Sequence, residues 1–335
     1  MTAESTDADT TGTETTGGAP RVAALVYNPI KVDLEALRAG VATAEAAAGW
    51  GTSLWFPTSE DDPGQGAARQ ALEAGADMVI AAGGDGTVRA VAEGMRDSSV
   101  SLALLPSGTG NLLARNLHLT LEDLDNALQT AFSGQDRAID LGVIEIRRED
   151  DSITEHVYVV MAGLGLDAKM LANTDDDLKK RVGWLAYAKA IAATLRDKNQ
   201  LRFRYSFDDR PARSIRAHTI IVGNCGALPA NIVLLPDAAI DDGLFDILLL
   251  RPEGVLGWVQ ILLKVFWENG VLRRLPFAHK LPGHENDALR YVKAKSVVVK
   301  LRDPEDIELD GDGFGKAVGF RTRVDPGALT VRVPA

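Results

Sequence analysis

The chain has 335 residues, more than one ordinary hydrophobic core organises, and this length predicts two domains. Hydrophobic residues make up 46% and charged residues 25% of the chain, as in ordinary globular proteins. The formal net charge of -11 argues against a nucleic-acid partner, because phosphate backbones are bound through surplus Lys and Arg. Cys225 is the only cysteine, which excludes an intrachain disulfide and fits a cytoplasmic protein.

The sequence predicts neither a signal peptide nor a membrane-spanning segment. Residues 1–20 are rich in Thr, Gly, Ala and acidic residues, and we expect a disordered tail there rather than a signal peptide. The most apolar later stretch, residues 255–271, is interrupted by Gln260, Lys264 and Glu268. Such side chains are costly in hydrocarbon, so we expect a protein that touches the inner membrane surface peripherally and does not cross it.

From residue 21 onward, short apolar runs alternate with helical patterns. The expected strands are residues 22–27, 52–56, 76–82 and 102–105, and the expected helices are residues 32–49, 66–74, 87–95 and 111–116. Strands that alternate with helices of this size are typical of a mostly parallel sheet. Residues 21–135 therefore predict a doubly wound α/β domain.

After residue 134 the pattern becomes β-rich. Strands are expected at residues 138–146, 156–161, 201–207, 217–222, 244–250 and 296–301, with helices only at 176–196 and 255–274. Few helices separate these runs, so residues 136–322 predict a second, mostly antiparallel β-sandwich domain. A last strand at residues 329–333 could belong to either domain.

The strongest chemical signal is the run Gly83-Gly84-Asp85-Gly86-Thr87, placed between a buried strand and a helix. Glycines let the backbone approach an anion closely, and the helix start offers free amides and a positive dipole end. The Asp85 carboxylate would repel phosphate unless a magnesium ion lies between them. A tight turn with a helix cap is the simpler alternative, but two adjacent glycines and a carboxylate exceed what a turn requires.

A second loop of this kind follows the next strand. Ser107, Gly108, Thr109 and Asn111 lie between an expected strand and helix, so both loops should open at the carboxyl edge of the sheet. Ser107 and Thr109 could donate to a phosphate or base, and Asn111 could cap the helix or contact the ligand. Neither loop carries the lysine of a P-loop, so magnesium and backbone amides must carry most of the phosphate charge.

Together with Asn28-Pro29, these two loops resemble the catalytic domain of the diacylglycerol, sphingosine and ceramide lipid kinases, most closely the soluble bacterial diacylglycerol kinases. The similarity extends over nearly all of residues 21–335. It implies ATP and Mg²⁺ in a cleft between the domains, bound through Asn28 and the two loops, with Asp85 near the metal. It also implies a lipid acceptor that faces the β-sandwich domain, and a C-terminal segment, residues 323–335, that returns to the first domain.

Three short segments depart from the family pattern. Arg89-Ala90 stands where the family often has Asn-Glu, and Asn111-Leu112 stands where it often has Asn-Asp. Ile30-Lys31 replaces a small residue and a glycine after Asn28-Pro29. These positions bear on the nucleotide and acceptor contacts more than on the reaction.

The acidic pair Asp310 and Asp312 matches the family's Asp-Gly-Glu sequence. The resemblance implies that Asp310 is the base that takes the proton of the lipid hydroxyl, and that Asp312 orients the acceptor or contacts magnesium. Alternation along a strand would put Glu308, Asp310 and Asp312 on one face, and a carboxylate there could accept the proton as the phosphorus bond forms. The alternative is a hairpin turn, which Asp-Gly also signals strongly.

Two further segments have an open interpretation. Asp241-Asp242-Gly243 reads as a hairpin turn, and the resemblance suggests a structural Mg²⁺ there with Asp242 and Leu244 as the ligand positions. The expected helix over residues 176–196 carries basic residues beside aromatic ones, which suits an anionic membrane surface. A core helix with a solvated basic face explains the same pattern.

The function expected from the sequence is an ATP-dependent lipid kinase that transfers the γ-phosphate of ATP to a lipid hydroxyl, with diacylglycerol as the default acceptor and phosphatidic acid as the product. One alternative is a kinase acting on NAD, because that family shares the Gly-Gly-Asp-Gly-Thr loop. Another is a catalytically inactive module that binds lipid and nucleotide. The sequence does not distinguish among acceptor lipids. It is compatible with a monomer and with a homodimer.

Overall fold

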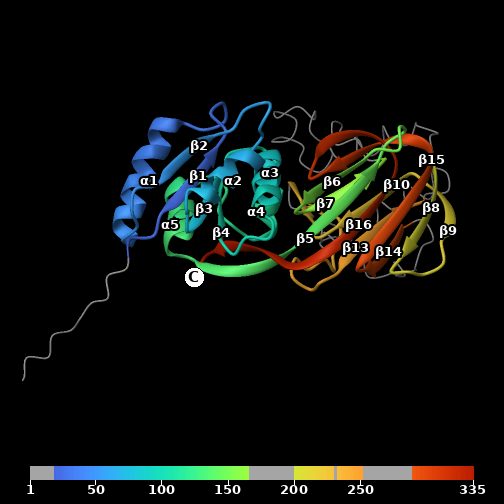
Figure 1. Cartoon of the computed structure of the whole chain (residues 1–335). Coiled ribbons are helices and arrows are strands. Elements are labelled where there is room, and N and C mark those ends of the chain that lie inside the picture. The colour runs from blue at the N-terminus through green and yellow to red at the C-terminus, as the bar shows by residue number, and fades with distance from the viewer. Residues whose placement is uncertain (1–18, 166–199, 230–231, 252–288) are drawn as a thin grey trace, which may run out of the picture.

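The computed structural model describes residues 19–165, 200–229, 232–251 and 289–335 (Figure 1). Most of the expected N-terminal tail and the expected helices at residues 176–196 and 255–274 lie outside these ranges. No helix in the described part combines the length and the apolar character needed to cross a membrane.

The first domain is a parallel sheet with helices on both faces. The strand order is β2-β1-β3-β4-β16, and neighbouring strands are parallel. The first four strands are β1 (Ala23–Tyr27), β2 (Leu54–Pro57), β3 (Met78–Gly83) and β4 (Ser101–Pro106). The helices are α1 (Leu34–Ala48), α2 (Gln65–Glu73), α3 (Asp85–Met95), α4 (Leu112–Asn116) and α5 (Leu124–Ser133). Helices α1 and α5 cover one face, and α2, α3 and α4 cover the other.

Local sequence signals account for the ends of these elements. The side chain of Asp33 accepts hydrogen bonds from the backbone N–H groups of Glu35 and Ala36, which caps the start of α1. The helix ends at Gly49, whose φ of 71° is a left-handed conformation that suits glycine. Helix α5, which the sequence patterns did not identify, is capped in the same way by Asp123.

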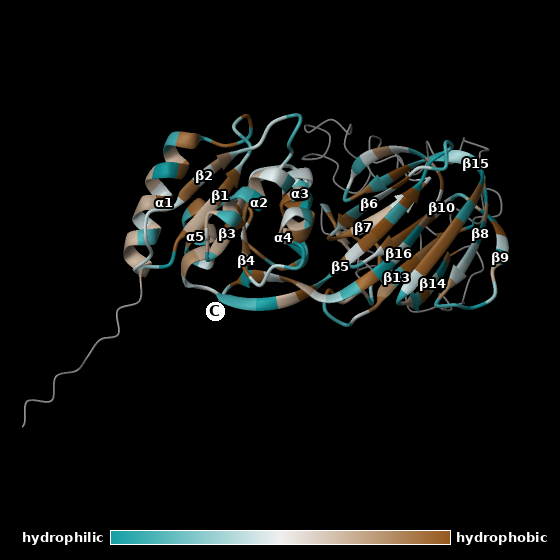
Figure 2. Ribbon diagram, viewed as in Figure 1, coloured by the Kyte–Doolittle hydropathy of each residue, from teal (hydrophilic) through white to brown (hydrophobic). Residues whose placement is uncertain are grey.

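The second domain is built from antiparallel strands in two layers. One layer contains β7 (Met161–Leu164), β10 (Thr219–Gly223), β13 (Phe245–Leu250) and β14 (Leu289–Ala294). The other contains β5 (Gln135–Arg147), β6 (Ile153–Tyr158), β8 (Leu201–Phe207), β9 (Arg213–Ala217), β15 (Ser296–Leu309) and β16 (Asp312–Val333). A short hairpin of β11 (Ala227–Leu228) and β12 (Ile232–Val233) is separate. Apolar side chains of both layers form one core, and Figure 2 shows hydrophobic residues along the strands of both domains.

Two long strands connect the domains (Figure 1). β5 and β16 pair with each other from Gln135 opposite Val333 to Arg147 opposite Gly319, so the ladder runs through both domains. Near its end β16 pairs with β4 of the first domain, with Val331 beside Leu102. The fold class expected from the sequence, a doubly wound α/β domain followed by a β-sandwich domain, is confirmed.

Candidate active site

Three loops meet at the carboxyl edge of the parallel sheet, where β1, β3 and β4 end. The chain leaves β1 toward α1 on one face of the sheet, and it leaves β3 toward α3 on the opposite face. Because β1 and β3 are neighbours, a crevice opens between their carboxyl ends, and open α/β sheets bind ligands at such a position. The two glycine-rich loops and Asn28 therefore line one crevice.

The two glycine-rich loops touch through their backbones. The N–H of Ser107 donates to the carbonyl oxygen of Gly83 at 3.1 Å. A β-carbon on Gly108 would lie 3.0 Å from the Cα of Gly84, and one on Gly83 would lie 2.7 Å from the Cβ of Thr87. A side chain on Gly108 would push the two loops apart, and one on Gly83 would collide with Thr87 within the first loop, so glycine is required at both positions.

Most polar side chains of the loops hold the loops in shape. The Asn111 amide bonds to the backbone of Gly108 in both directions, as donor at 2.8 Å and acceptor at 3.1 Å. The Asn28 side chain accepts from the N–H of Ile30 at 3.0 Å, and the Ser107 hydroxyl donates to the Leu105 carbonyl at 3.1 Å. Thr109 is exposed at the loop tip. The exposed Thr109 side chain and the uncapped N–H groups in the first turn of α3 are thus the groups best placed for a ligand.

Asp85 begins α3 and joins the two loops. Its carboxylate accepts from the N–H of Leu112 and faces the α-carbon of Gly110, where no β-carbon fits. Burial raises the pKa of Asp85 above its usual value, against the N–H groups of Leu112 and Asn111, and the charge of Asp312 raises it further. Leu112, which departs from the family pattern in its side chain, therefore still contacts Asp85 through its backbone N–H.

Asp310 lies in the turn of the hairpin formed by β15 and β16, and its carboxylate is enclosed. Asp310 and Gly311 have φ values of 50° and 91° and form a tight two-residue hairpin turn between the paired residues Leu309 and Asp312. The Asp310 side chain is 3% exposed. Its oxygens accept from the consecutive N–H groups of residues 159, 160 and 161 at 2.8, 2.8 and 2.9 Å. Burial raises its pKa to about 6, while these three N–H groups act in the opposite direction.

Asp312 has the opposite surroundings. It is exposed, and its Oδ2 lies 2.5 Å from the point where a β-carbon on Gly86 would sit. The second domain thus places a carboxylate against the first glycine-rich loop, near enough to Asp85 for their charges to interact. The two acids that the resemblance paired therefore have different surroundings. Asp310 accepts hydrogen bonds from the backbone of residues 159–161, and Asp312 faces the crevice.

Arg89, one of the family departures, joins α3 to the same hairpin. Its side chain is buried, its Nη1 lies 3.3 Å from Oε2 of Glu93, and its guanidinium lies 4.5 Å from the centre of the Phe314 ring. Phe314 follows Asp312 on β16. Arg89 therefore packs the strand that carries Asp312 against the helix that begins with Asp85.

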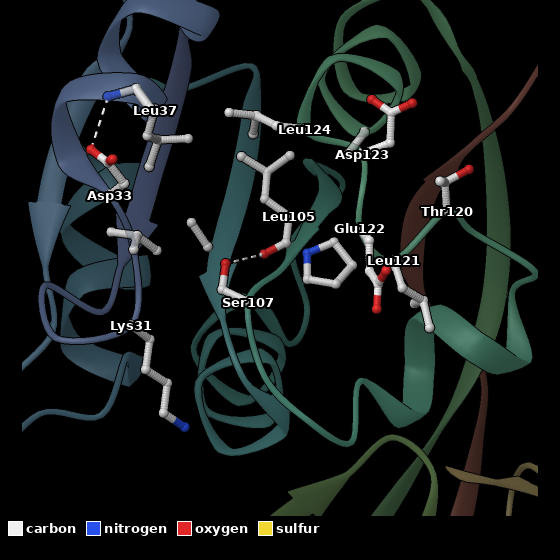
Figure 3. Close-up of a pocket in the computed structure, with 15 residues that line it drawn as sticks. Lys31, Asp33, Leu37, Leu105, Ser107, Thr120, Leu121, Glu122, Asp123 and Leu124 are labelled. Carbon is white, nitrogen blue, oxygen red and sulfur yellow. Dashed lines mark hydrogen bonds between the residues drawn. The ribbon is translucent and has the colours of Figure 1, made fainter. Parts of the chain in front are cut away.

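Lys31 is a site residue that the sequence patterns did not identify. Its Nζ lies 3.0 Å from the position of a β-carbon on Gly84, so the ammonium sits on the first glycine-rich loop. Lys31 also lines a cavity of about 260 Å³ between α1 and α5, at the end opposite Leu37 and Leu124 (Figure 3). The signal was present as a lysine three residues after Asn28, but only the fold brings it to Gly84.

The expected structural metal site in the second domain is filled by a side chain. Lys293 donates from Nζ to the carbonyl oxygen of Asp237 at 2.8 Å and to Oδ2 of Asp242 at 2.9 Å, and it lies 3.2 Å from Oδ2 of Asp246. The other oxygen of Asp242 accepts from the N–H of Leu244. An ammonium among these oxygens does not fit a divalent cation at Asp242 and Leu244. In the described ranges, no three acidic, His or Cys side chains gather in a metal-binding arrangement.

The enclosure of Asp310 gives a stability prediction. Asp310→Asn is expected to lower the free energy of unfolding by about 1–3 kcal/mol, because the amide NH₂ would face one of the three N–H donors. Urea denaturation measures this, with Asp306→Asn on the exposed part of β15 as the control. If Asp310→Asn is as stable as the wild type but has no turnover, the variant would support Asp310 as the base.

Comparisons with known proteins identify the family and agree with the fold. Residues 25–144 match the model of the diacylglycerol kinase catalytic domain, and residues 159–333 match the YegS C-terminal NAD kinase beta sandwich-like domain. A diacylglycerol kinase structure from Bacillus anthracis str. Sterne has a TM-score of 0.65 at 18% identity, covering 94% of this chain and 97% of that chain. Yeast NADH kinase has a TM-score of 0.51 at 9% identity, covering 94% and 84%. At these identities the two structures show a shared fold.

Sequence relatives are more similar. A Pseudomonas aeruginosa (strain UCBPP-PA14) protein described as "Probable lipid kinase YegS-like" is 32% identical over 317 residues, which is 93% of this chain and 94% of that protein. The Bacillus subtilis (strain 168) diacylglycerol kinase is 26% identical over 275 residues, covering 81% and 82%. The chain therefore belongs to the lipid kinase family that includes the YegS-like kinases and the bacterial diacylglycerol kinases.

Proposed function

We propose that this protein transfers the γ-phosphate of ATP to the hydroxyl of a lipid, with diacylglycerol as the first acceptor to test and phosphatidic acid as the product. Family membership supports phosphoryl transfer to a lipid. The observation that carries the proposal is the position of Asp312, a carboxylate of the second domain that faces Gly86 and Asp85 of the first. Nucleotide loops and an exposed acid meet in one crevice.

The loops supply most of the nucleotide contacts in this proposal. N–H groups in the first turn of α3, which no side chain caps, bind the phosphates, and Asn28 holds the loop that leads to Lys31. A carboxylate at the start of α3, beside the N–H groups that would bind phosphate, suits Mg²⁺. When bound, Mg²⁺ offsets the charge of the phosphates, and Asp85 is the residue that holds it.

Asp312 is the base in this proposal, in place of Asp310. The lipid oxygen attacks the γ-phosphorus, a new O–P bond forms, and the bond from this phosphorus to the departing ADP oxygen breaks. The hydroxyl proton passes to Asp312, which is exposed and faces the loop. Both oxygens of Asp310 are occupied by backbone N–H groups, so Asp310 shapes the hairpin that presents Asp312.

Lys31 gives a test of the phosphate position. Lys31→Ala is expected to weaken Mg·ATP binding by about tenfold, because the variant lacks the ammonium at Gly84 that attracts phosphate. Adenosine, which has no phosphate, should bind as it does to the wild type. Isothermal titration calorimetry with each ligand measures the difference. Ile30→Ala is the control, because Ile30 is 91% exposed beside it. An equal loss for adenosine and ATP would contradict a phosphate contact.

The proposed reaction is tested with purified protein, labelled ATP and a total lipid extract, followed by identification of the labelled product. Pure diacylglycerol and NAD are then compared as acceptors. Label in phosphatidic acid supports the proposal, and label in another lipid changes the acceptor. Label only in NAD, or binding of ATP without any transfer, would replace the proposal by the small-molecule kinase or by the inactive binding module.

A further inference from the structure

The outer face of one layer of the second domain carries a group of exposed basic side chains on four adjacent strands. This basic face consists of Arg202 and Arg204 on β8, Arg216 on β9, Lys300 on β15 and Arg321 on β16. The alternate residues of β8 point the other way and belong to the core. Strand pairing therefore places the five cations on one surface.

The register puts like charges directly opposite each other. Arg202 is paired with Arg216 across β8 and β9, and Arg204 is paired with Lys300 across β8 and β15. Like charges in directly opposed positions destabilise a sheet. Two such pairs in succession lower the stability of the sheet.

Glu145 on β5 lies directly opposite Arg321 at the edge of the basic face, but the other four cations have no acid as a paired neighbour on β8, β9 or β15. Among the described residues, no carboxylate forms an ion pair with any of these five cations. At the border of the same layer, by contrast, Arg147 pairs with Asp151 at 2.7 Å and Arg323 lies 3.8 Å from Asp325. The chain as a whole has a net charge of -11, so this local excess of positive charge runs against its composition. The face is complementary to an extended anionic surface.

We infer that the basic face docks the protein on an anionic lipid bilayer. The inference deepens the proposed function, because a kinase with a lipid acceptor works at a membrane surface. A sheet face with cations on adjacent strands suits an extended layer of negative headgroups. Lys300 and Arg321 lie on the two strands of the hairpin whose turn carries Asp310 and leads into Asp312. Docking through this face would tether the active-site hairpin to the surface that holds the substrate.

Vesicle co-sedimentation of the full chain tests this inference. The protein is expected to bind vesicles of phosphatidylglycerol and phosphatidylcholine in equal parts, to ignore pure phosphatidylcholine, and to dissociate as salt rises. The triple variant Arg202→Gln, Arg204→Gln, Arg216→Gln should lose about 100-fold in partitioning, since each basic residue near such a surface adds roughly fivefold. The matched control is Arg69→Gln, Arg251→Gln, Arg290→Gln, which removes three exposed cations outside the basic face and should bind like the wild type.

The triple variant should fold at least as stably as the wild type, because it removes like-charge contacts. Thermal unfolding checks this. Wild-type protein that ignores anionic vesicles, or a triple variant that binds them like the wild type, would overturn the inference. Lipid phosphorylation in neutral detergent micelles is measured separately. Transfer in micelles without vesicle binding refutes the docking face alone, and vesicle binding without transfer to any lipid refutes the proposed function alone.

Discussion

Asp312→Asn is expected to fold like the wild-type protein and to lose about 100- to 10,000-fold in kcat for lipid phosphorylation, the range that a positioned general base contributes. The physical reason is that Asn does not accept the hydroxyl proton, although it fills the same space. Asp312 is exposed, so an amide of the same size at this position does not disturb a packed core. Steady-state rates with labelled ATP measure the loss, and thermal unfolding checks the fold.

The interpretation of this variant depends on two comparisons. Asp306→Asn, which removes an exposed carboxylate from the same hairpin away from the loops, should keep wild-type turnover. The Michaelis constant for ATP should change far less than kcat in Asp312→Asn, because Asp312 acts on the acceptor proton in the proposed mechanism. Wild-type turnover in Asp312→Asn, with Asp310→Asn inactive but stable, would assign the base to Asp310.

Asp85→Asn is expected to reduce turnover by about a thousandfold or more, because the side chain that would hold Mg²⁺ is no longer charged. The fold should not suffer. Burial raises the pKa of Asp85, so keeping it ionised at neutral pH costs stability in the folded state. A neutral amide removes that cost and still accepts from Leu112, which offsets the loss of the hydrogen bond from the N–H of Asn111. The melting temperature without ligand should therefore stay close to that of the wild type.

Differential scanning fluorimetry with and without Mg·ATP separates this prediction from simple damage. The wild type should gain stability with Mg·ATP in proportion to ligand occupancy, and Asp85→Asn should gain much less. Asp77→Asn, an exposed acid at the opposite end of β3, is the control and should respond like the wild type. A full stabilisation by Mg·ATP in Asp85→Asn would show that Asp85 does not hold the metal.

Local patterns in the chain were sufficient for much of the first domain. Apolar runs of strand length, each followed by a loop rich in glycine or asparagine and a helix, predicted β1, β3, β4 and the helices that follow them within a few residues. The positions of the two glycine-rich loops followed, because the carboxyl ends of parallel strands lie on one edge. Helix α5 was missed, although Asp123 provides an ordinary cap for it.

The roles of the individual acids depended on tertiary structure. Asp310 and Asp312 are two residues apart and chemically alike, yet one is enclosed by N–H groups of residues 159–161 and the other faces Gly86. Asp242 likewise contacts an ammonium 51 positions away in the chain. The contacts of Lys31 with Gly84 and of Arg89 with Phe314 also join residues that are far apart in the sequence.

There is a physical reason why the sequence predicted the secondary structure and the loop positions but not the roles of the individual acids. Secondary structure and loop position follow from short-range periodicity, backbone preference and capping, all of which are written in neighbouring residues. The charge state, accessibility and partners of a side chain depend on which distant segments pack around it. The sequence by itself therefore determined the fold class, the family and the positions of the two glycine-rich loops of this protein. Only the folded arrangement of the two domains decided which carboxylate faces these loops and which cations lie beside them.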